Sequence, residues 1–168
     1  MKKFEVHGFT LIEILVSMTI IGFLFSFGYA SFRDFSRRQA LAGVVKQVQG
    51  DLRLAQQKAL SGEKPSACVT PTVRTLDAYN FYRSAANAYI IRADCSGLTT
   101  AVNVKSVTLP AGVVISAPSP NPIKFKVLGQ GTNIPIPITG TGLAIITLTQ
   151  AGFPDSQVIT VTAGGEIK

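Results

Sequence analysis

The residue types that carry out catalysis or bind metals are scarce in this chain of 168 residues. His7 is the single histidine, and Cys68 and Cys95 are the two cysteines. One histidine and two cysteines are too few for a zinc site of four cysteines or a site of several histidines, and they exclude most histidine-dependent catalysis. The carboxylates after Glu13 show no spacing typical of an acid–base pair; they are Asp34, Asp51, Glu63, Asp77, Asp94, Asp155 and Glu166. We therefore predict no enzymatic activity, no metal site and no cofactor.

The carboxylate in the most unusual place is Glu13, which lies near the start of a long apolar stretch. From Ile14 to Phe32 there are 19 residues without a charged side chain. That is about the length that a helix needs to cross a hydrocarbon core of about 30 Å. We expect residues 9–32 to form a transmembrane helix, in which a carboxylate is costly and usually functional.

A local explanation of Glu13 is also open. Thr10 and Glu13 have the spacing of a capping box, and Phe9 and Ile14 are placed as a hydrophobic staple. Under this alternative, Glu13 stabilises the N-terminus of its own helix and needs no partner from another chain.

The junction Gly8-Phe9-Thr10-Leu11-Ile12-Glu13 resembles the class III signal of type IV pilins and type II secretion pseudopilins. The resemblance implies that residues 1–8 are a leader, that a prepilin peptidase cuts after Gly8, and that the new amino group of Phe9 is N-methylated. It implies a single-pass protein of the inner membrane, with a cytoplasmic N-terminus and an extracytoplasmic head, that later enters a filament. The implied partners are other pilin or pseudopilin subunits, the peptidase, an inner-membrane assembly platform and membrane lipid.

Electrostatics gives Glu13 a specific expected role in such an assembly. An α-amino group has a pKa near 8, so a methylated Phe9 amine stays positively charged. In lipid, this charge and the Glu13 carboxylate are each costly alone and attract one another more strongly than in water. We expect Glu13 to pair with the N-terminus of a neighbouring subunit.

Beyond residue 32 the pattern changes to that of a one-sided helix over residues 33–62. Apolar side chains recur every three or four residues at Leu41, Val44, Val45, Val48, Leu52, Ala55 and Ala59. This spacing predicts an amphipathic helix with one face to bury, which ends at Gly62 ahead of Pro65. At its start, Arg33, Arg37 and Arg38 are expected to contact anionic lipid headgroups.

The remaining residues, 63–168, contain all nine prolines and predict a β-rich globular head. The candidate strands are residues 67–73, 88–93, 102–109, 113–116, 123–128, 143–149 and 158–162. The predicted fold class is therefore α+β: a long N-terminal helix, transmembrane and then amphipathic, packed on an antiparallel β-sheet or β-sandwich.

Cys68 and Cys95 fall in the part of the chain that we expect outside the cytoplasm, where disulfides persist. Closing a loop of this size stabilises a protein by about 3–4 kcal/mol in the chain-entropy model. Two separate buried thiols are the alternative, because cysteine is among the most buried residue types. A Cys68–Cys95 disulfide is the prediction we favour.

Four segments are similar to the GspH/FimT-like minor pilins, namely residues 52–62, 109–113, 123–125 and 159–165. Some members of that subfamily serve DNA uptake, which adds nucleic acid as an alternative partner. The basic residues of the head are dispersed, whereas phosphate binding normally needs clustered charge. Arg83, next to Phe81 and Tyr82, is the strongest local candidate for such binding.

Together these observations predict a non-enzymatic minor pilin or pseudopilin subunit. It would assemble into, or prime, a type IV pilus or a type II secretion pseudopilus after cleavage by the prepilin peptidase. Two alternatives stay open: a DNA-uptake minor pilin that binds DNA, and a single-span membrane anchor with a binding domain that never assembles.

Overall fold

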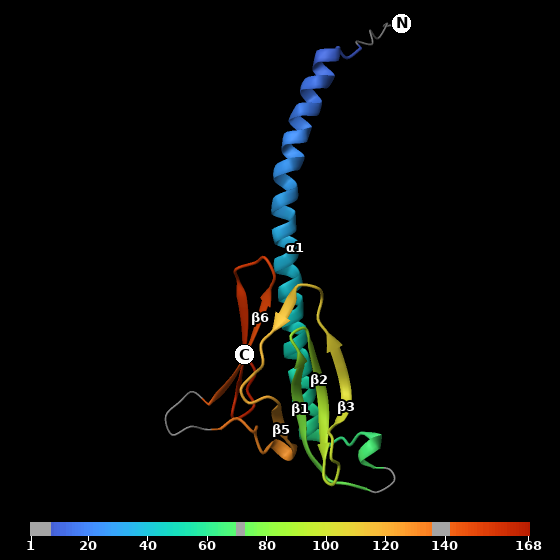
Figure 1. The fold of residues 1–168 in the computed structure, drawn as a ribbon, viewed down its shortest axis with the longest axis vertical. Helices are drawn as coiled ribbons and strands as arrows, with labels where there is room; N and C mark the ends of the chain where they lie inside the picture. The colour runs from blue at the N-terminus through green and yellow to red at the C-terminus, as the bar shows by residue number, and fades with distance from the viewer. Residues whose placement is uncertain (1–7, 70–72, 136–141) are drawn as a thin grey trace, which may run out of the picture. The chain divides into compact units, whose positions relative to one another are not determined.

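The computed structural model describes residues 8–69, 73–135 and 142–168, without the side chains of residues 26–31. It divides into two units, an N-terminal unit that ends at Gln39 and a head unit from Ala40 to Lys168. One helix, α1 (Leu11–Ser61), contributes to both units (Figure 1). Residues 1–7, which include most of the expected leader, lie outside the described residues.

The head carries two antiparallel sheets. In sheet A the strand order is β3-β2-β1-β5, with β1 (Leu76–Ala85), β2 (Ala88–Cys95), β3 (Val102–Thr108) and β5 (Ile123–Lys126). In sheet B the order is β4-β6-β7, with β4 (Val113–Ile115), β6 (Leu143–Gln150) and β7 (Ser156–Thr162). Two short 3-10 helices, η1 (Ser66–Cys68) and η2 (Val127–Gly129), flank β1 and β5 in the chain. The predicted α+β class, a long helix followed by antiparallel sheets, is confirmed.

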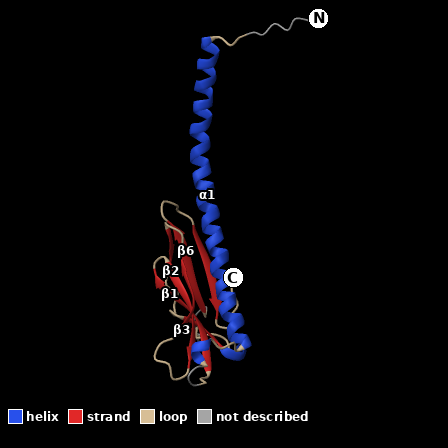
Figure 2. Cartoon of the chain, turned by 90° about the vertical axis from the view of Figure 1, so that its right-hand side faces the viewer, coloured by secondary structure: helices blue, strands red, loops and turns tan. Residues whose placement is uncertain are grey.

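The part of α1 within the head runs alongside the strands and supplies one side of the core (Figure 2). Its buried side chains are those that the three- and four-residue spacing selects: Leu41, Val44, Val48, Leu52, Ala55 and Ala59. Sheet A contributes Tyr79, Phe81, Tyr89 and Ile91, and sheet B contributes Ile146, Leu148, Ile159 and Val161. The helix thus buries its apolar face against both sheets in one continuous core, which sets the position of the polar side chains on the same helix.

The end of α1 follows the sequence signals. Ser61 is the last helical residue, and Gly62 takes a φ of +66°, a conformation that favours glycine. Its N–H donates to the carbonyl oxygen of Ala59 at 3.3 Å. The chain therefore leaves the helix at the predicted glycine.

The predicted strand over residues 67–73 is wrong in its described part. Residues 66–68 form η1 instead, because the N–H groups of Cys68 and Val69 donate to the nearby carbonyls of Pro65 and Ser66, at 2.9 Å each. Residues 70–72 lie outside the described residues. Backbone groups that bond locally in this way are not available to a sheet.

Two further differences concern sheet A. No strand is predicted over β1, the longest of the described strands, because Asp77, Asn80 and Arg83 interrupt its apolar alternation. The strand predicted over residues 123–128 ends at Lys126, since the chain turns into η2 and Leu128 takes a φ of 55°. In both places the alternation of a half-buried strand is interrupted. In β1 polar side chains interrupt it, and after Lys126 a turn of the backbone does.

Candidate functional site

The residues of the expected processing site lie just ahead of α1. Gly8, Phe9 and Thr10 are irregular backbone, and the Phe9 side chain is 79% exposed. Thr10 Oγ1 accepts a hydrogen bond from the Glu13 N–H at 3.4 Å, which is an N-cap contact. The structure therefore contains the Thr10 half of the capping box, and the exposed Glu13 carboxylate stands one turn beyond Phe9.

The first turns of α1 carry apolar side chains that nothing in the described chain covers. Phe9, just ahead of the helix, and eleven side chains of α1 are between 46% and 83% exposed; the eleven are Leu11, Ile12, Ile14, Leu15, Val16, Met18, Ile20, Ile21, Phe23, Leu24 and Phe25. Because consecutive residues are exposed, the apolar surface surrounds the helix instead of forming one stripe. Soluble monomers rarely expose apolar surface on this scale, so the segment is suited to an apolar environment.

Two hydroxyl side chains of this segment, those of Ser17 and Thr19, are bonded within the helix. Ser17 Oγ donates to the carbonyl oxygen of Glu13 at 2.6 Å, and Thr19 Oγ1 lies 2.7 Å from that of Val16. Such bonds lower the cost of placing hydroxyls in an apolar environment. Among the described residues, however, no helix is both long enough and apolar enough to span a membrane. The transmembrane helix expected over residues 9–32 is not confirmed.

The structure brings the two cysteines together. Cys68 of η1 and Cys95 at the end of β2 form a disulfide, with Cα atoms 6.0 Å apart and both side chains buried. Around it, Arg74 Nη1 donates to the carbonyl oxygen of Gly97 at 2.6 Å, and the Ser96 N–H donates to that of Thr75 at 2.9 Å. These contacts hold the chain between α1 and β1 against the end of β2.

A buried carboxylate on α1, which the sequence analysis does not single out, faces sheet A. Asp51 Oδ2 accepts a hydrogen bond from Tyr89 Oη, and Asp51 Oδ1 lies 2.6 Å from Lys105 Nζ. Burial, followed by the hydrogen bond to Asp51, raises the pKa of Tyr89 above its usual range. Both oxygens of the Asp51 carboxylate are bonded within the protein, so the cluster has a structural role.

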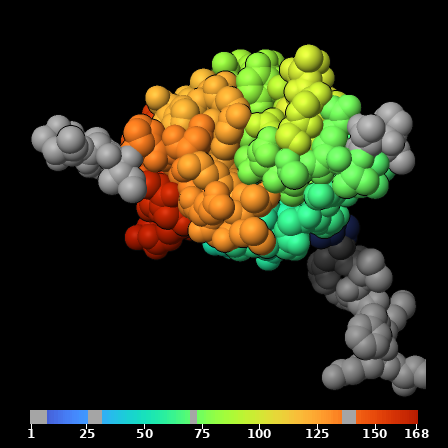
Figure 3. Space-filling view, turned by 90° about the horizontal axis from the view of Figure 1, so that it is seen from below, coloured from blue at the N-terminus to red at the C-terminus, as the bar shows by residue number. Residues whose placement is uncertain are grey.

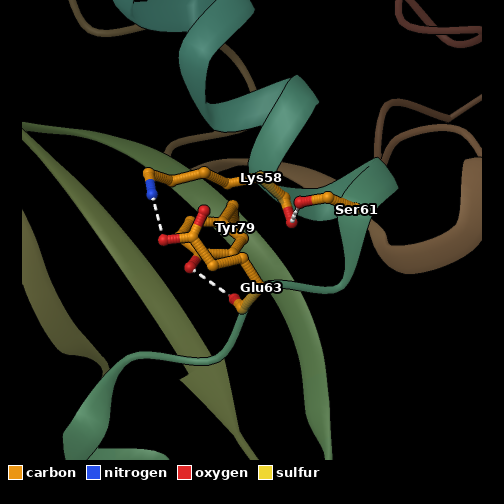
Figure 4. Close-up of polar contacts among 4 residues, drawn as sticks. All are labelled: Lys58, Ser61, Glu63 and Tyr79. Atoms are coloured by element: carbon orange, nitrogen blue, oxygen red, sulfur yellow. Dashed lines mark hydrogen bonds and ion pairs between the residues drawn. The ribbon is translucent and has the colours of Figure 1, made fainter.

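A second polar cluster closes the end of α1 (Figure 4). Tyr79 Oη donates to the backbone oxygen of Glu63 at 2.7 Å, and Lys58 Nζ lies 2.6 Å from Glu63 Oε1. Ser61 Oγ donates to the backbone oxygen of Lys58 at 3.2 Å. Burial of the Tyr79 ring, followed by the charge of Glu63, raises the pKa of Tyr79. These contacts fix where the chain turns from the helix toward sheet A.

Arg83, the local candidate for nucleic-acid binding, is engaged inside the head. Its Nε donates to the carbonyl oxygen of Ile115 at 3.1 Å, which links sheet A to sheet B. Phe81 is fully buried, with its ring centroid 4.9 Å from that of Tyr89, and the guanidinium of Arg92 covers the ring of Tyr82. The three neighbours in sequence therefore do not form a common exposed surface.

Over residues 8–69, 73–135 and 142–168, no three His, Cys, Asp or Glu side chains gather as metal ligands would. The described titratable clusters at Asp51 and Glu63 hold α1 in place, as shown above.

The family comparison matches the N-terminal segment of the chain. Residues 5–29 match the family described as the prokaryotic N-terminal methylation motif. The chain is also 39% identical over 61 residues to a "Probable minor fimbrial protein" of Dichelobacter nodosus, which covers 36% of each chain. The matched part spans about a third of the length of this curated relative. No solved structure matches the chain significantly. The methylation motif and the similarity to a minor fimbrial protein together support a type IV minor pilin or pseudopilin.

Proposed function

We propose that the protein is a non-enzymatic minor pilin or pseudopilin subunit that assembles into, or primes, a type IV pilus or a type II secretion pseudopilus. The observation that carries the proposal is the exposed apolar surface around α1 between Phe9 and Phe25, on a chain whose head has a closed core of its own. An exposed apolar surface of this extent favours burial against another molecule.

The energetic argument favours two successive environments for the segment. Burying a large apolar side chain stabilises by about 1.5–3 kcal/mol, so the twelve exposed side chains together strongly favour burial. Inner-membrane lipid would cover them before assembly, in a single-pass arrangement with the head outside the cytoplasm. The helices of other subunits would cover them inside a filament.

Processing would take place where the chain enters α1. Gly8 and Phe9 are irregular backbone just ahead of Leu11, a conformation that a prepilin peptidase could bind without first unwinding a helix. Cleavage after Gly8 and N-methylation would leave a positively charged amine on Phe9. The same event would remove residues 1–8 and place that charge at the membrane boundary.

Glu13 would then direct assembly. It lies four residues after Phe9, about 6 Å along a helix axis. Thr10 bonds to the Glu13 N–H, while the Glu13 side chain is exposed, so the carboxylate is available to an amine of another chain. Pairing between the Phe9 amine of an incoming subunit and Glu13 of an assembled one would fix their stagger. The inner-membrane assembly platform would supply the subunits to the growing filament.

Terminal sequencing and intact-mass measurement of protein extracted from membranes test this proposal. We expect a mature chain that begins at Phe9 and carries one added methyl group. Co-expression with an inactive prepilin peptidase should leave residues 1–8 in place. A mature start at any other residue would rule out the processing step and, with it, the pilin function.

A further inference from the structure

The first turn of α1 has the geometry of an N-cap at Thr10. Leu11 is the first helical residue, and the Ile14 N–H donates to the Thr10 carbonyl oxygen at 3.3 Å, as the first bond of an α-helix does. Thr10 Oγ1 accepts from the N–H of Glu13, the third helical residue, at 3.4 Å. An N-cap residue makes both of these bonds, one through its carbonyl oxygen and one through its side chain. Thr10 therefore marks the place at which the helix begins.

Within the described part of the chain, only local contacts set this start. The bonds of Thr10 reach residues three and four positions later, and the side chains of Leu11, Ile12 and Ile14 are 49–83% exposed. The head has a core of its own, and Figure 3 shows its surface where the teal end of α1 meets the green and orange segments. Because packing does not hold the helix start at Leu11, the N-cap has to do so.

The cap leaves the Gly8 carbonyl outside the helical bonding pattern. The carbonyl oxygens that accept helical bonds begin at Thr10, two residues after Gly8. Hydrolysis after Gly8 adds water across the bond between the Gly8 carbonyl carbon and the Phe9 nitrogen. The hydroxyl stays on Gly8, and the proton leaves on the Phe9 amine. A carbonyl oxygen without a helical bond can accept the donors that a peptidase uses to stabilise the developing negative charge.

Loss of the cap would move the helix start toward this bond. The sequence ahead of the cap contains no Ser, Thr, Asn or Asp, and Gly8 is its one residue of a type that caps well. With Gly8 as N-cap, its carbonyl oxygen would accept the Ile12 N–H. The next hydroxyls along the chain are those of Ser17 and Thr19, and a start there would leave backbone groups unpaired on an apolar segment. Extension to Gly8 is therefore the less costly change.

We propose that Thr10 is a positioning residue for processing, because its cap keeps the Gly8–Phe9 bond in irregular chain that a prepilin peptidase can bind. A chain whose helix starts at Gly8 must give up helical bonds before it binds the peptidase. Binding then weakens in proportion to the fraction of chains that are ready to bind, whereas the rate after binding stays the same. The inference rests on the proposed function and adds a residue to it.

Cleavage of the full chain, with residues 1–8 in place, by a purified prepilin peptidase in detergent micelles tests this role. Thr10→Val keeps the shape of the side chain and removes the oxygen that caps the helix. We expect KM to rise about threefold with kcat unchanged, because an N-cap shifts the choice of helix start by about this factor. Thr10→Ser restores a cap oxygen and should restore KM. Thr19→Val removes a hydroxyl from inside the same helix and is the matched control.

Two further measurements separate capping from direct recognition of the threonine side chain. Thr10→Asn caps a helix well but has a different shape, so capping predicts that it is cleaved like the unchanged chain. Carbonyl NMR and amide hydrogen exchange report where the helix starts. In Thr10→Val, the Gly8 carbonyl signal should move in the helical direction, and the Ile12 N–H should become protected.

An unchanged KM for Thr10→Val would overturn the inference, as would a Gly8 carbonyl signal that stays in its non-helical position in that variant. Slow cleavage of Thr10→Asn with a normal helix start would also overturn it, because the peptidase would then recognise the threonine itself. These results leave the proposed function intact, since the unchanged chain would still be cut after Gly8. Failure of the unchanged chain to be cut there would instead refute the proposed function and this inference together.

Discussion

Tyr89 on β2 donates a buried hydrogen bond of 2.8 Å to Asp51 on α1, and so joins the long helix to sheet A. The Asp51 side chain is only 7% exposed, while Lys105 on the edge strand β3 approaches its other oxygen from the solvent side. A buried carboxylate is tolerated when its oxygens are bonded in this way. The pair therefore adds a directional contact to the apolar packing between helix and sheet.

Removing the Asp51 carboxylate should destabilise the head. Asp51→Ala leaves the buried Tyr89 hydroxyl without an acceptor, and we expect a loss of about 2–3 kcal/mol in the free energy of unfolding. Asp51→Asn keeps an acceptor oxygen and should lose about 1 kcal/mol. Urea unfolding measures both, with exposed Asp155→Asn as control. Equal stability of Asp51→Ala and the control would show that the cluster contributes nothing.

Stability should fall in alkaline solution because of the buried tyrosines. Burial, aided by Asp51, raises the pKa of Tyr89, and burial, aided by Glu63, raises that of Tyr79. The folded state therefore keeps these protons at a pH where the unfolded state, with a tyrosine pKa of about 10, releases them. Their contribution is complete below about pH 10 and is lost as the pH rises further.

The measurement is the free energy of unfolding from about pH 9 to about pH 11.5. Tyr89→Phe should show a shallower decrease than the unchanged protein across this range, although it is less stable at neutral pH. An identical decrease in both proteins would exclude Tyr89 as a source of the alkaline sensitivity.

The Glu13→Gln variant separates the two explanations of Glu13. If the carboxylate pairs with the amine of a neighbouring subunit, the variant should be cleaved and inserted normally but recruited poorly into the filament. If Glu13 only caps its helix, glutamine can replace it and recruitment should be nearly normal. Immunoblotting of sheared filaments at matched expression measures recruitment, and Asp34→Asn on the same helix is the control. Normal incorporation of Glu13→Gln would falsify the pairing.

The disulfide predicts a measurable loss on removal. Changing both Cys68 and Cys95 to serine should lower the free energy of unfolding by about 3 kcal/mol, because the unfolded chain gains freedom over the 27-residue separation. Peptide mapping without reductant should recover the two cysteines in one linked pair. Recovery of two free thiols from the intact protein would contradict the bond.

Gly165 should not tolerate a side chain. Its φ is +92°, and an added Cβ would lie 2.9 Å from Gln56 Nε2, which donates to the Gly165 carbonyl oxygen. We expect Gly165→Ala to destabilise the head by about 1–3 kcal/mol. The matched control is Gly43→Ala in the middle of α1, where an added Cβ meets nothing and helix propensity should improve by about 0.5–1 kcal/mol. Thermal unfolding should therefore move in opposite directions for the two changes, and a shift in the same direction would contradict this account.

The sequence correctly predicts those features that are formed by residues close together in the chain. The spacing from Leu41 to Ala59 identifies the buried helix face, and Gly62 marks its end. The candidate processing site from Gly8 to Glu13 is likewise a local pattern. Local patterns can be read because the residues that act together are also neighbours in the chain.

The parts that could not be predicted depend on distant residues. Asp51 looks like an ordinary polar position of an amphipathic helix, since its partners Tyr89 and Lys105 come 38 and 54 residues later. Strand β1 shows no clear alternation because Asp77, Asn80 and Arg83 interrupt it, and only the sheet order places Asn80 between Arg92 and Lys124. Pairing across strands, and not local propensity, decides both positions.

The Cys68–Cys95 bond also determines how a mechanical load would travel through the subunit. The backbone leaves α1 at Ser61 and reaches sheet A only at Leu76, but the disulfide reaches the end of β2 from Cys68. A pull along the helix would therefore act on two neighbouring strands at once. The covalent path from the end of α1 to sheet A thus runs through the disulfide to β2 as well as through the backbone to β1.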